Sequence, residues 1–161
     1  MVVQPKPGVQ ERILLHLSDF SDFMDSVEVP FALSQMGIAN AVAIARSNVP
    51  RAIAGLKDQG LLVERQAHVN GVSRKRKAYF LTDSGMKLAE ETWRRLREFP
   101  FRVILPDGNT IASTLGDIQD QLPFTMRPVD VIRYLDDNGV LAHHRLDGGD
   151  ARIVRGRLYG V

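Results

Sequence analysis

Pro50 fixes where a helix can begin in the middle of this chain. Proline lacks the N–H that an interior helical position donates to the carbonyl four residues earlier, so Pro50 must lie in a first turn. Ser47 is a suitable N-cap for such a helix, and Gly60 supplies a stop signal. Three apolar residues around the proline recur at helical spacing: Val49, Ile53 and Leu56. The pattern therefore predicts an amphipathic helix over residues 47–58.

Two further helices are predicted before this one. The apolar residues of segment 9–22 recur at intervals of three and four, which is typical of an amphipathic helix. Residues 22–30 are acidic and end in a proline, and we interpret them as a connection. Ser34 can cap a short helix of about two turns that begins at Gln35.

A hairpin and a fourth helix are predicted after Gly60. Residues 61–69 favour a strand, Asn70-Gly71 is the strongest short signal for a two-residue hairpin turn, and residues 73–81 supply the return strand. Thr82 or Asp83 then caps a helix that ends near Phe99-Pro100. The order helix, short helix, helix, hairpin, helix predicts a winged helix-turn-helix.

The same region resembles a known family. Gln35, Ala39 and Ala43-Ile44 are spaced as in the helix-turn-helix signature, and His68-Val69-Asn70-Gly71 precedes a basic run, an aromatic pair and Leu81-Thr82. Over about residues 9–98 the chain resembles winged transcriptional regulators of the MarR type, and archaeal winged-helix proteins that carry this wing pattern. The resemblance implies binding to double-stranded DNA, usually as a homodimer.

Ala43 departs from the helix-turn-helix signature, which usually has glycine in the turn between the two helices. Left-handed dihedrals are costly for alanine. We therefore expect a longer or differently shaped turn at this point.

The positive charge is concentrated in one stretch. The 161 residues carry 21 Lys and Arg against 19 Asp and Glu, a net charge of only +2. Residues 46–82, however, hold eight basic and two acidic side chains, which is a net charge of +6. Such a stretch is typical of a surface that meets phosphates, and the alternative is a solvated basic loop.

Composition excludes several classes of site. Without cysteine, the chain has no disulfide, thiolate zinc site, iron–sulfur cluster or cysteine nucleophile. It also has no apolar run of about 18 residues and no apolar signal core, so we expect a cytoplasmic protein. No nucleophile and base, phosphate-cradling loop or metal-ligand spacing is evident. We expect a binding protein without cofactor or metal, and not an enzyme.

The predicted third helix has the features of a recognition helix. Its outer face is small and polar, which allows approach to the floor of a major groove. On that face Arg51 suits guanine and Asn48 suits adenine. Gly55 favours close approach to DNA, and the alternative is that it relieves packing within the domain.

Four consecutive cations follow the predicted hairpin turn, and long flexible cations in a wing suit phosphates or a minor groove. The alternative is protection of an edge strand against aggregation. We expect the DNA-binding residues to be Arg46, Ser47, Asn48, Arg51, Ala54, Gly55, Lys57, Arg65, Arg74, Lys75, Arg76 and Lys77.

For the aromatic residues and histidines, a structural role is favoured over ligand binding. Tyr79-Phe80 and Trp93 could form a platform for single strands, but core packing is favoured. His16 and His68 are expected to be structural. His143-His144 point in opposite directions on a predicted strand and cannot readily share a metal ion.

The remaining residues predict a second small α+β domain over 99–161, after a DNA-binding domain over 1–98. Two hairpins are expected, over 101–112 and 140–158, with helices that begin near Thr114 and Pro128. The segment 135–141 echoes 56–62, and a hairpin follows each, which suggests a degenerate second winged helix.

Two functions are consistent with these patterns. The first is a sequence-specific DNA-binding transcriptional regulator, with residues 47–58 in the major groove and a wing over 64–81 on the backbone or in the minor groove. The second is a protein-interaction or sensory winged-helix module within a larger signalling protein.

Overall fold

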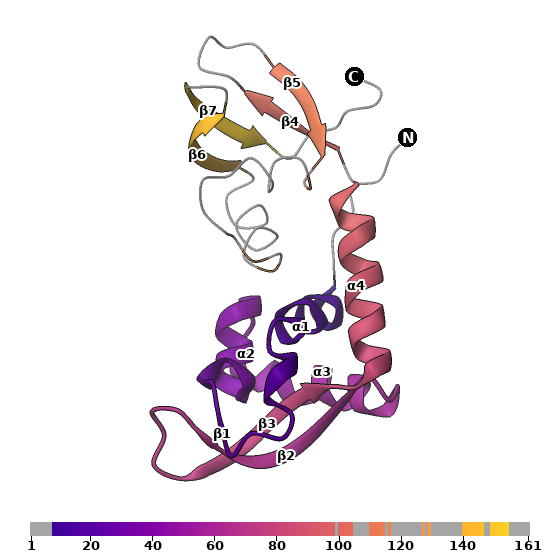
Figure 1. The fold of residues 1–161 in the computed structure, drawn as a ribbon, viewed down its shortest axis with the longest axis vertical. Coiled ribbons are helices and arrows are strands. Elements are labelled where there is room, and N and C mark those ends of the chain that lie inside the picture. The colour runs from indigo at the N-terminus through magenta and orange to yellow at the C-terminus, as the bar shows by residue number, and fades with distance from the viewer. Residues whose placement is uncertain are drawn as a thin grey trace. The chain divides into compact units, whose positions relative to one another are not determined.

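The computed structural model describes residues 8–98, 100–104, 110–114, 116, 127, 129, 140–146 and 149–154. The chain divides into two units, one over Pro7–Thr92 and a second formed by residues 1–6 and 93–161. Both α-helices and β-sheets are present (Figure 1), which confirms the expected α+β class. Within the described residues, no helix is long and apolar enough to cross a membrane.

Helix α1 (Val9–Ser18) provides much of the core of the first unit. It buries the apolar side chains of Ile13, Leu14, Leu15 and Leu17. The helix ends earlier than the expected residue 22, because a separate 3₁₀ turn, η1 (Ser21–Phe23), follows it. His16 is buried, and its Nε2 lies 2.7 Å from the carbonyl oxygen of Ala32, so the expected structural role of His16 is confirmed.

Helix α2 (Gln35–Val42) begins as expected, after a 3₁₀ turn, η2 (Phe31–Leu33). The hydroxyl of Ser34 accepts a hydrogen bond from the Gly37 N–H at 3.1 Å and donates one to the Phe31 carbonyl at 2.7 Å. The helix ends at Ala43, which takes the left-handed conformation at φ 57° and ψ 50°. Alanine therefore adopts the dihedrals that glycine usually supplies, and residues 43–48, which include a 3₁₀ turn, connect α2 to α3.

Helix α3 (Val49–Asp58) follows the 3₁₀ turn η3 (Arg46–Asn48). Pro50 lies in its first turn as predicted, but Asn48 occupies the N-cap position in place of Ser47, because the 3₁₀ turn takes up residues 46–48. Gly60, at φ 72°, ends the helix as predicted. The N–H of Gly60 donates to the Lys57 carbonyl and that of Leu61 to the Leu56 carbonyl, the pattern of a glycine-terminated helix.

Three strands form the sheet of this unit, in the order β1-β2-β3. β2 (Leu62–Val69) and β3 (Lys75–Leu81) are the antiparallel hairpin that the sequence predicts, with Leu62 opposite Leu81 and His68 opposite Lys75. β1 (Glu28–Val29) pairs in parallel with the end of β2. This two-residue strand lies in the segment that we interpreted only as a connection.

The tip of the hairpin differs from the predicted two-residue turn. The Val72 N–H donates to the Val69 carbonyl at 3.0 Å, so Asn70-Gly71 does form a turn, with Gly71 at φ 81°. The ladder between the strands, however, begins only at the pair His68 and Lys75. The tip therefore contains residues 70–74, and the first of the four cations, Arg74, lies outside the strand.

Helix α4 (Asp83–Arg97) begins at the expected residue. The Thr82 hydroxyl accepts a hydrogen bond from the Gly85 N–H at 3.1 Å and so caps its first turn. Before it, Tyr79 and Phe80 are buried, which confirms their interpretation as core residues, whereas Trp93 on α4 is half-buried.

The second unit contains a four-stranded antiparallel sheet in the order β5-β4-β7-β6. β4 (Pro100–Ile104) pairs with β5 (Thr110–Thr114), and β6 (Val140–Leu146) pairs with β7 (Gly149–Val154), so both expected hairpins are present. Pairing of β4 with β7 joins them into one sheet. The helices expected after Thr114 and from Pro128 lie almost wholly outside the described residues, and a second winged helix stays a prediction.

Candidate nucleic-acid interface

Helix α3 presents a polar face to solvent. Its apolar residues Val49, Ile53 and Leu56 are buried, and α3 packs on α1, α2 and β2 through that side. The opposite side is exposed, as the helical spacing predicts. It includes these residues of η3 and α3: Ser47, Asn48, Arg51, Ala54 and Asp58.

Gly55 does not lie on this exposed face. A Cβ at position 55 would collide with the side-chain amide of Gln10 on α1. The same amide group of Gln10 accepts a hydrogen bond from Gln59 Nε2 at 3.2 Å. Gly55 thus gives room to a side chain of the neighbouring helix, and the structure favours packing over the expected approach to a groove.

The wing, residues 64–81, carries its cations on exposed positions. Arg74 lies in the tip, Lys75, Arg76 and Lys77 belong to β3, and all four side chains are exposed. Among the described residues, no acidic side chain lies within ion-pair distance of Arg74, Lys75 or Arg76. These three charges are therefore available to an external anion.

Glu64 connects the wing to α3. Its Oε2 lies 3.7 Å from Lys57 Nζ on α3 and 3.9 Å from Lys77 Nζ on β3. The two lysine side chains are 43% and 55% exposed, so each pair is surface-like and weak. One carboxylate therefore holds a cation of the helix and a cation of the wing beside each other.

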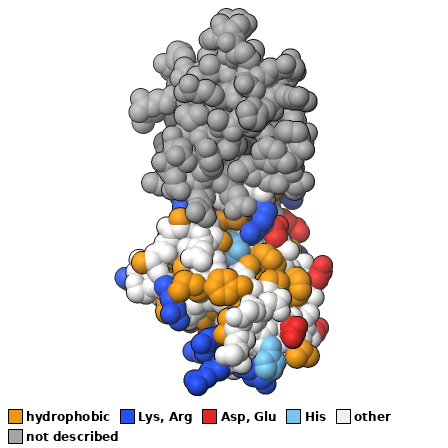
Figure 2. Space-filling model, turned by 90° about the vertical axis from the view of Figure 1, so that its left-hand side faces the viewer, with side chains coloured by type: hydrophobic (Ala, Val, Ile, Leu, Met, Phe, Trp, Pro, Cys, Tyr) orange, Lys and Arg blue, Asp and Glu red, His pale blue; other side chains and the backbone are white. Residues whose placement is uncertain are grey.

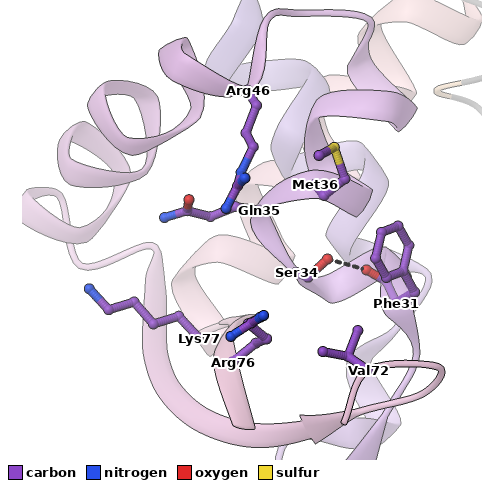
Figure 3. A pocket seen from close by; sticks show the side chains of 8 residues that line it. All are labelled: Phe31, Ser34, Gln35, Met36, Arg46, Val72, Arg76 and Lys77. Carbon is purple, nitrogen blue, oxygen red and sulfur yellow. Dashed lines mark hydrogen bonds between the residues drawn. The ribbon is translucent and has the colours of Figure 1, made fainter. Parts of the chain in front are cut away.

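A cavity of about 330 Å³ lies between α2, η3 and the wing (Figure 3). Arg46 reaches down into it from η3, and Arg76 lies opposite on β3, whereas the side chain of Lys77 lines its edge and extends to the left of the view. The cavity is lined by Phe31, Ser34, Gln35, Met36, Arg46, Val72, Arg76 and Lys77. Three of the expected DNA-binding cations therefore line one cavity.

The side chain of Gln35 is fixed beside this cavity. Its Nε2 donates to the hydroxyl of Tyr79 at 2.9 Å. Burial raises the pKa of Tyr79, the hydrogen bond from Gln35 lowers it in part, and the charge of Glu64 raises it further. The phenol is therefore neutral at physiological pH and acts as an acceptor for Gln35.

Arg65 is engaged inside the protein. Its guanidinium donates to the carbonyls of Met24 at 2.8 Å, Phe23 at 3.1 Å and Ser26 at 2.6 Å. It also lies over the ring of Phe80, 4.5 Å from the ring centroid. These contacts use the charge that we expected to meet DNA, and the guanidinium instead fixes the loop before β1 to the sheet.

Basic and acidic side chains gather in different parts of the face that Figure 2 shows. Figure 2 shows basic side chains toward the lower left and the bottom of the described part, with acidic side chains along its right edge. Hydrophobic side chains lie between them.

Among the described residues, no group of three histidine, aspartate or glutamate side chains could hold a metal ion.

The arrangement of α2, η3, α3 and the β2–β3 hairpin decides the fold. Two helices joined by a tight turn are followed by a hairpin, and α3, the second of these helices, packs on strand β2 of that hairpin. Residues 8–92 form a winged helix-turn-helix. The expectation from the sequence is confirmed in its element order.

Solved structures with similarity to this chain include transcription regulators. MepR, described as a transcription regulator of the Staphylococcus aureus multidrug efflux pump MepA, is 24% identical with a TM-score of 0.41, over 55% of this chain and 56% of MepR. A MepR–DNA complex from the same organism is 27% identical with a TM-score of 0.37, over 50% and 51%. A mutant of Lactococcus lactis ZitR in apo form is 22% identical with a TM-score of 0.41, over 54% and 55%.

The chain thus spans about half the length of these structures. No protein-family model matches the chain, and no curated protein matches it significantly.

Proposed function

We propose that this chain is a sequence-specific transcriptional regulator that binds double-stranded DNA. Residues 47–58 enter the major groove, and the wing, residues 64–81, lies on the backbone or in the minor groove. The protein works in the cytoplasm as a homodimer on near-palindromic sites, and it needs no cofactor.

The position of Lys77 carries this proposal. Lys77 lines the cavity that also receives Arg46, and it shares Glu64 with Lys57. Arg46 lies just before α3 and Lys57 lies near its end. Lys77 therefore extends from the wing toward α3, so that one duplex can meet the helix in a groove and the wing on the adjoining backbone.

Base contacts are assigned to two side chains of the exposed helix face. Arg51 is long, exposed and without an acidic partner among the described residues, so it can donate two hydrogen bonds to guanine. Asn48 lies in the 3₁₀ turn at the start of the helix and suits adenine. Ala54 is exposed on α3 between Arg51 and the C-terminal end of the helix. Its small side chain would let the helix come close to the bases at the floor of the major groove.

Phosphate contacts are assigned to the remaining exposed cations. Phosphate contacts set affinity and orientation, whereas base contacts set specificity. Gly55 is not included because it faces the side chain of Gln10 on α1, and Arg65 is not included because its guanidinium donates to carbonyls within the protein. The assigned residues are Arg46, Lys57, Arg74, Lys75, Arg76 and Lys77.

The test is binding to a fluorescent duplex over a range of salt concentrations, after selection of a preferred site from random duplexes. We expect the logarithm of affinity to fall linearly with the logarithm of salt concentration. Arg51→Ala should reduce the preference for the selected site and leave binding to an unrelated duplex nearly unchanged. Lys87→Ala, which removes an exposed cation of α4, is the matched control and should change neither.

Absence of duplex binding would contradict the proposal. Capture of a protein partner by a chain that binds no duplex would instead support the interaction-module hypothesis. Binding without any preference among duplexes would leave DNA binding in place and remove its sequence specificity.

A further inference from the structure

The cavity between α2, η3 and the wing collects positive charge from two separate parts of the chain. Arg46 comes from η3, and Arg76 and Lys77 come from β3, about thirty residues later. Among the residues that the structure describes, no acidic side chain lines the cavity. The chain therefore holds three cations around one concave space, where they repel one another unless an anion enters.

The cations of the cavity are free to accept an anion. Among the described residues, neither Arg46 nor Arg76 has an acidic side chain within ion-pair distance. Lys77 has Glu64 at 3.9 Å, but its side chain is 55% exposed. A pair so exposed contributes little, and an anion that meets all three cations can replace it.

The lining of the cavity combines positive charge with apolar surface, as a phosphate and its neighbouring sugar require. Five of the eight lining residues are polar or charged: Ser34, Gln35, Arg46, Arg76 and Lys77. The three apolar residues, Phe31, Met36 and Val72, give a surface on which the sugar next to a phosphate can rest.

We propose that this cavity is a cradle for a single phosphate of the DNA backbone, shared by Arg46, Arg76 and Lys77. The inference rests on the proposed function, because the cradle lies between the helix assigned to the major groove and the wing assigned to the backbone. The strand that borders the groove passes between these elements, and one of its phosphates enters the cavity. Gln35, fixed by Tyr79, stands beside the bound group.

The salt dependence of duplex binding tests whether the three cations share one phosphate. The slope of log affinity against log salt counts the phosphates that a protein neutralises, at about 0.9 for each. The triple variant Arg46→Gln/Arg76→Gln/Lys77→Gln removes three charges but only one phosphate contact. We therefore expect its slope to be shallower than that of the unmodified chain by about 0.9.

A calibration comes from Arg74→Gln, which removes one wing cation outside the cavity. If Arg74 meets a phosphate of its own, this single substitution and the triple variant should reduce the slope by similar amounts. A reduction of about 2.7 in the triple variant, three times one contact, would overturn the cradle, because each cation would then have its own phosphate. An unchanged slope would overturn it as well. Thermal unfolding followed by circular dichroism should show that both variants remain folded.

Failure of the cradle and failure of the proposed function give different results. If the unmodified chain binds no duplex, the proposed function fails, and the inference fails with it. If it binds and the triple variant has the wrong slope, only the cradle fails.

Inorganic phosphate distinguishes the DNA backbone from a free anion. The unmodified chain and the triple variant are titrated with inorganic phosphate at constant ionic strength, and binding is followed by the amide NMR signals of residues 34–36 and 76–77. We expect only weak binding that does not saturate at low millimolar phosphate. Saturation in that range, together with a duplex slope that the triple variant leaves unchanged, would assign the cavity to a free phosphate and overturn the proposal.

Discussion

The guanidinium of Arg65 lies over the ring of Phe80, with its central carbon 4.5 Å from the ring centroid. Its N–H groups donate to three carbonyls of the loop between α1 and β1, those of Phe23, Met24 and Ser26. The sequence alone placed Arg65 among the DNA-binding cations. In the structure it instead holds the loop before β1 against the sheet. The planar fork of arginine is required for this arrangement, and lysine lacks it.

Substitution of Arg65 should affect stability. We expect Arg65→Lys to lower the free energy of unfolding by about 1–3 kcal/mol, because carbonyl groups lose their charged donors and the ring loses its partner. The measurement is urea unfolding followed by circular dichroism. Arg76→Lys makes the same chemical change at an exposed wing position and should stay within about 0.5 kcal/mol. Equal unfolding midpoints for the two variants would contradict the assigned role.

Substitution of Glu64 should strengthen DNA binding. Glu64→Gln removes the carboxylate that holds Lys57 and Lys77, and it frees both cations for phosphates. We expect the affinity for a duplex at low salt to rise by roughly threefold to tenfold, since each freed cation adds to the salt-dependent part of binding. Glu90→Gln, at an exposed position of α4, removes the same charge elsewhere and should have little effect. A lower affinity in Glu64→Gln would mean that the carboxylate positions the lysines for DNA.

Two neighbouring substitutions on α3 should have opposite consequences. Gly55→Ala meets only the mobile end of the Gln10 side chain and gains about 1 kcal/mol of helix propensity, so duplex affinity should stay within about twofold. Ala54→Glu places a negative charge on the exposed face and should lower affinity by about tenfold or more. Both affinities are measured by fluorescence anisotropy with the same duplex. A large loss in Gly55→Ala would restore the interpretation that Gly55 approaches the groove floor.

Glycine at position 43 should stabilise the protein. Ala43 has a φ of 57°, which costs alanine about 1–2 kcal/mol, whereas glycine adopts it freely. Glycine also gives the unfolded chain more freedom, so we expect Ala43→Gly to raise the free energy of unfolding by about 0.5–1 kcal/mol net. Ala41→Gly, inside α2, should lower it by about 1 kcal/mol. Destabilisation by both variants would show that the left-handed turn does not strain the alanine.

Local signals allowed most of the first unit to be predicted. Ser34, Pro50 and Gly60 act through the backbone of their own segments, so the helices they begin or end were found within a few residues. Periodicity likewise predicted the buried side of α3 and both strands of the hairpin.

The features that the sequence did not predict depend on distant partners. β1 is two residues long and exists only because β2 lies beside it. The role of Gly55 depends on Gln10, about forty-five residues earlier, and that of Arg65 on a loop about forty residues earlier. Asn70-Gly71 indicated a turn correctly, but the start of the ladder was set by pairing in the rest of the sheet.

The central position of β2 has a consequence for any fragment of this protein. β2 is flanked by β1 on one edge and by β3 on the other, and α3 packs on it. An excised peptide of residues 62–81 would keep every wing cation yet lose both the third strand and the helix, and lone two-stranded hairpins are marginally stable in water. Such a peptide should bind DNA only as an unstructured polycation, because the arrangement of its charges depends on the folded domain.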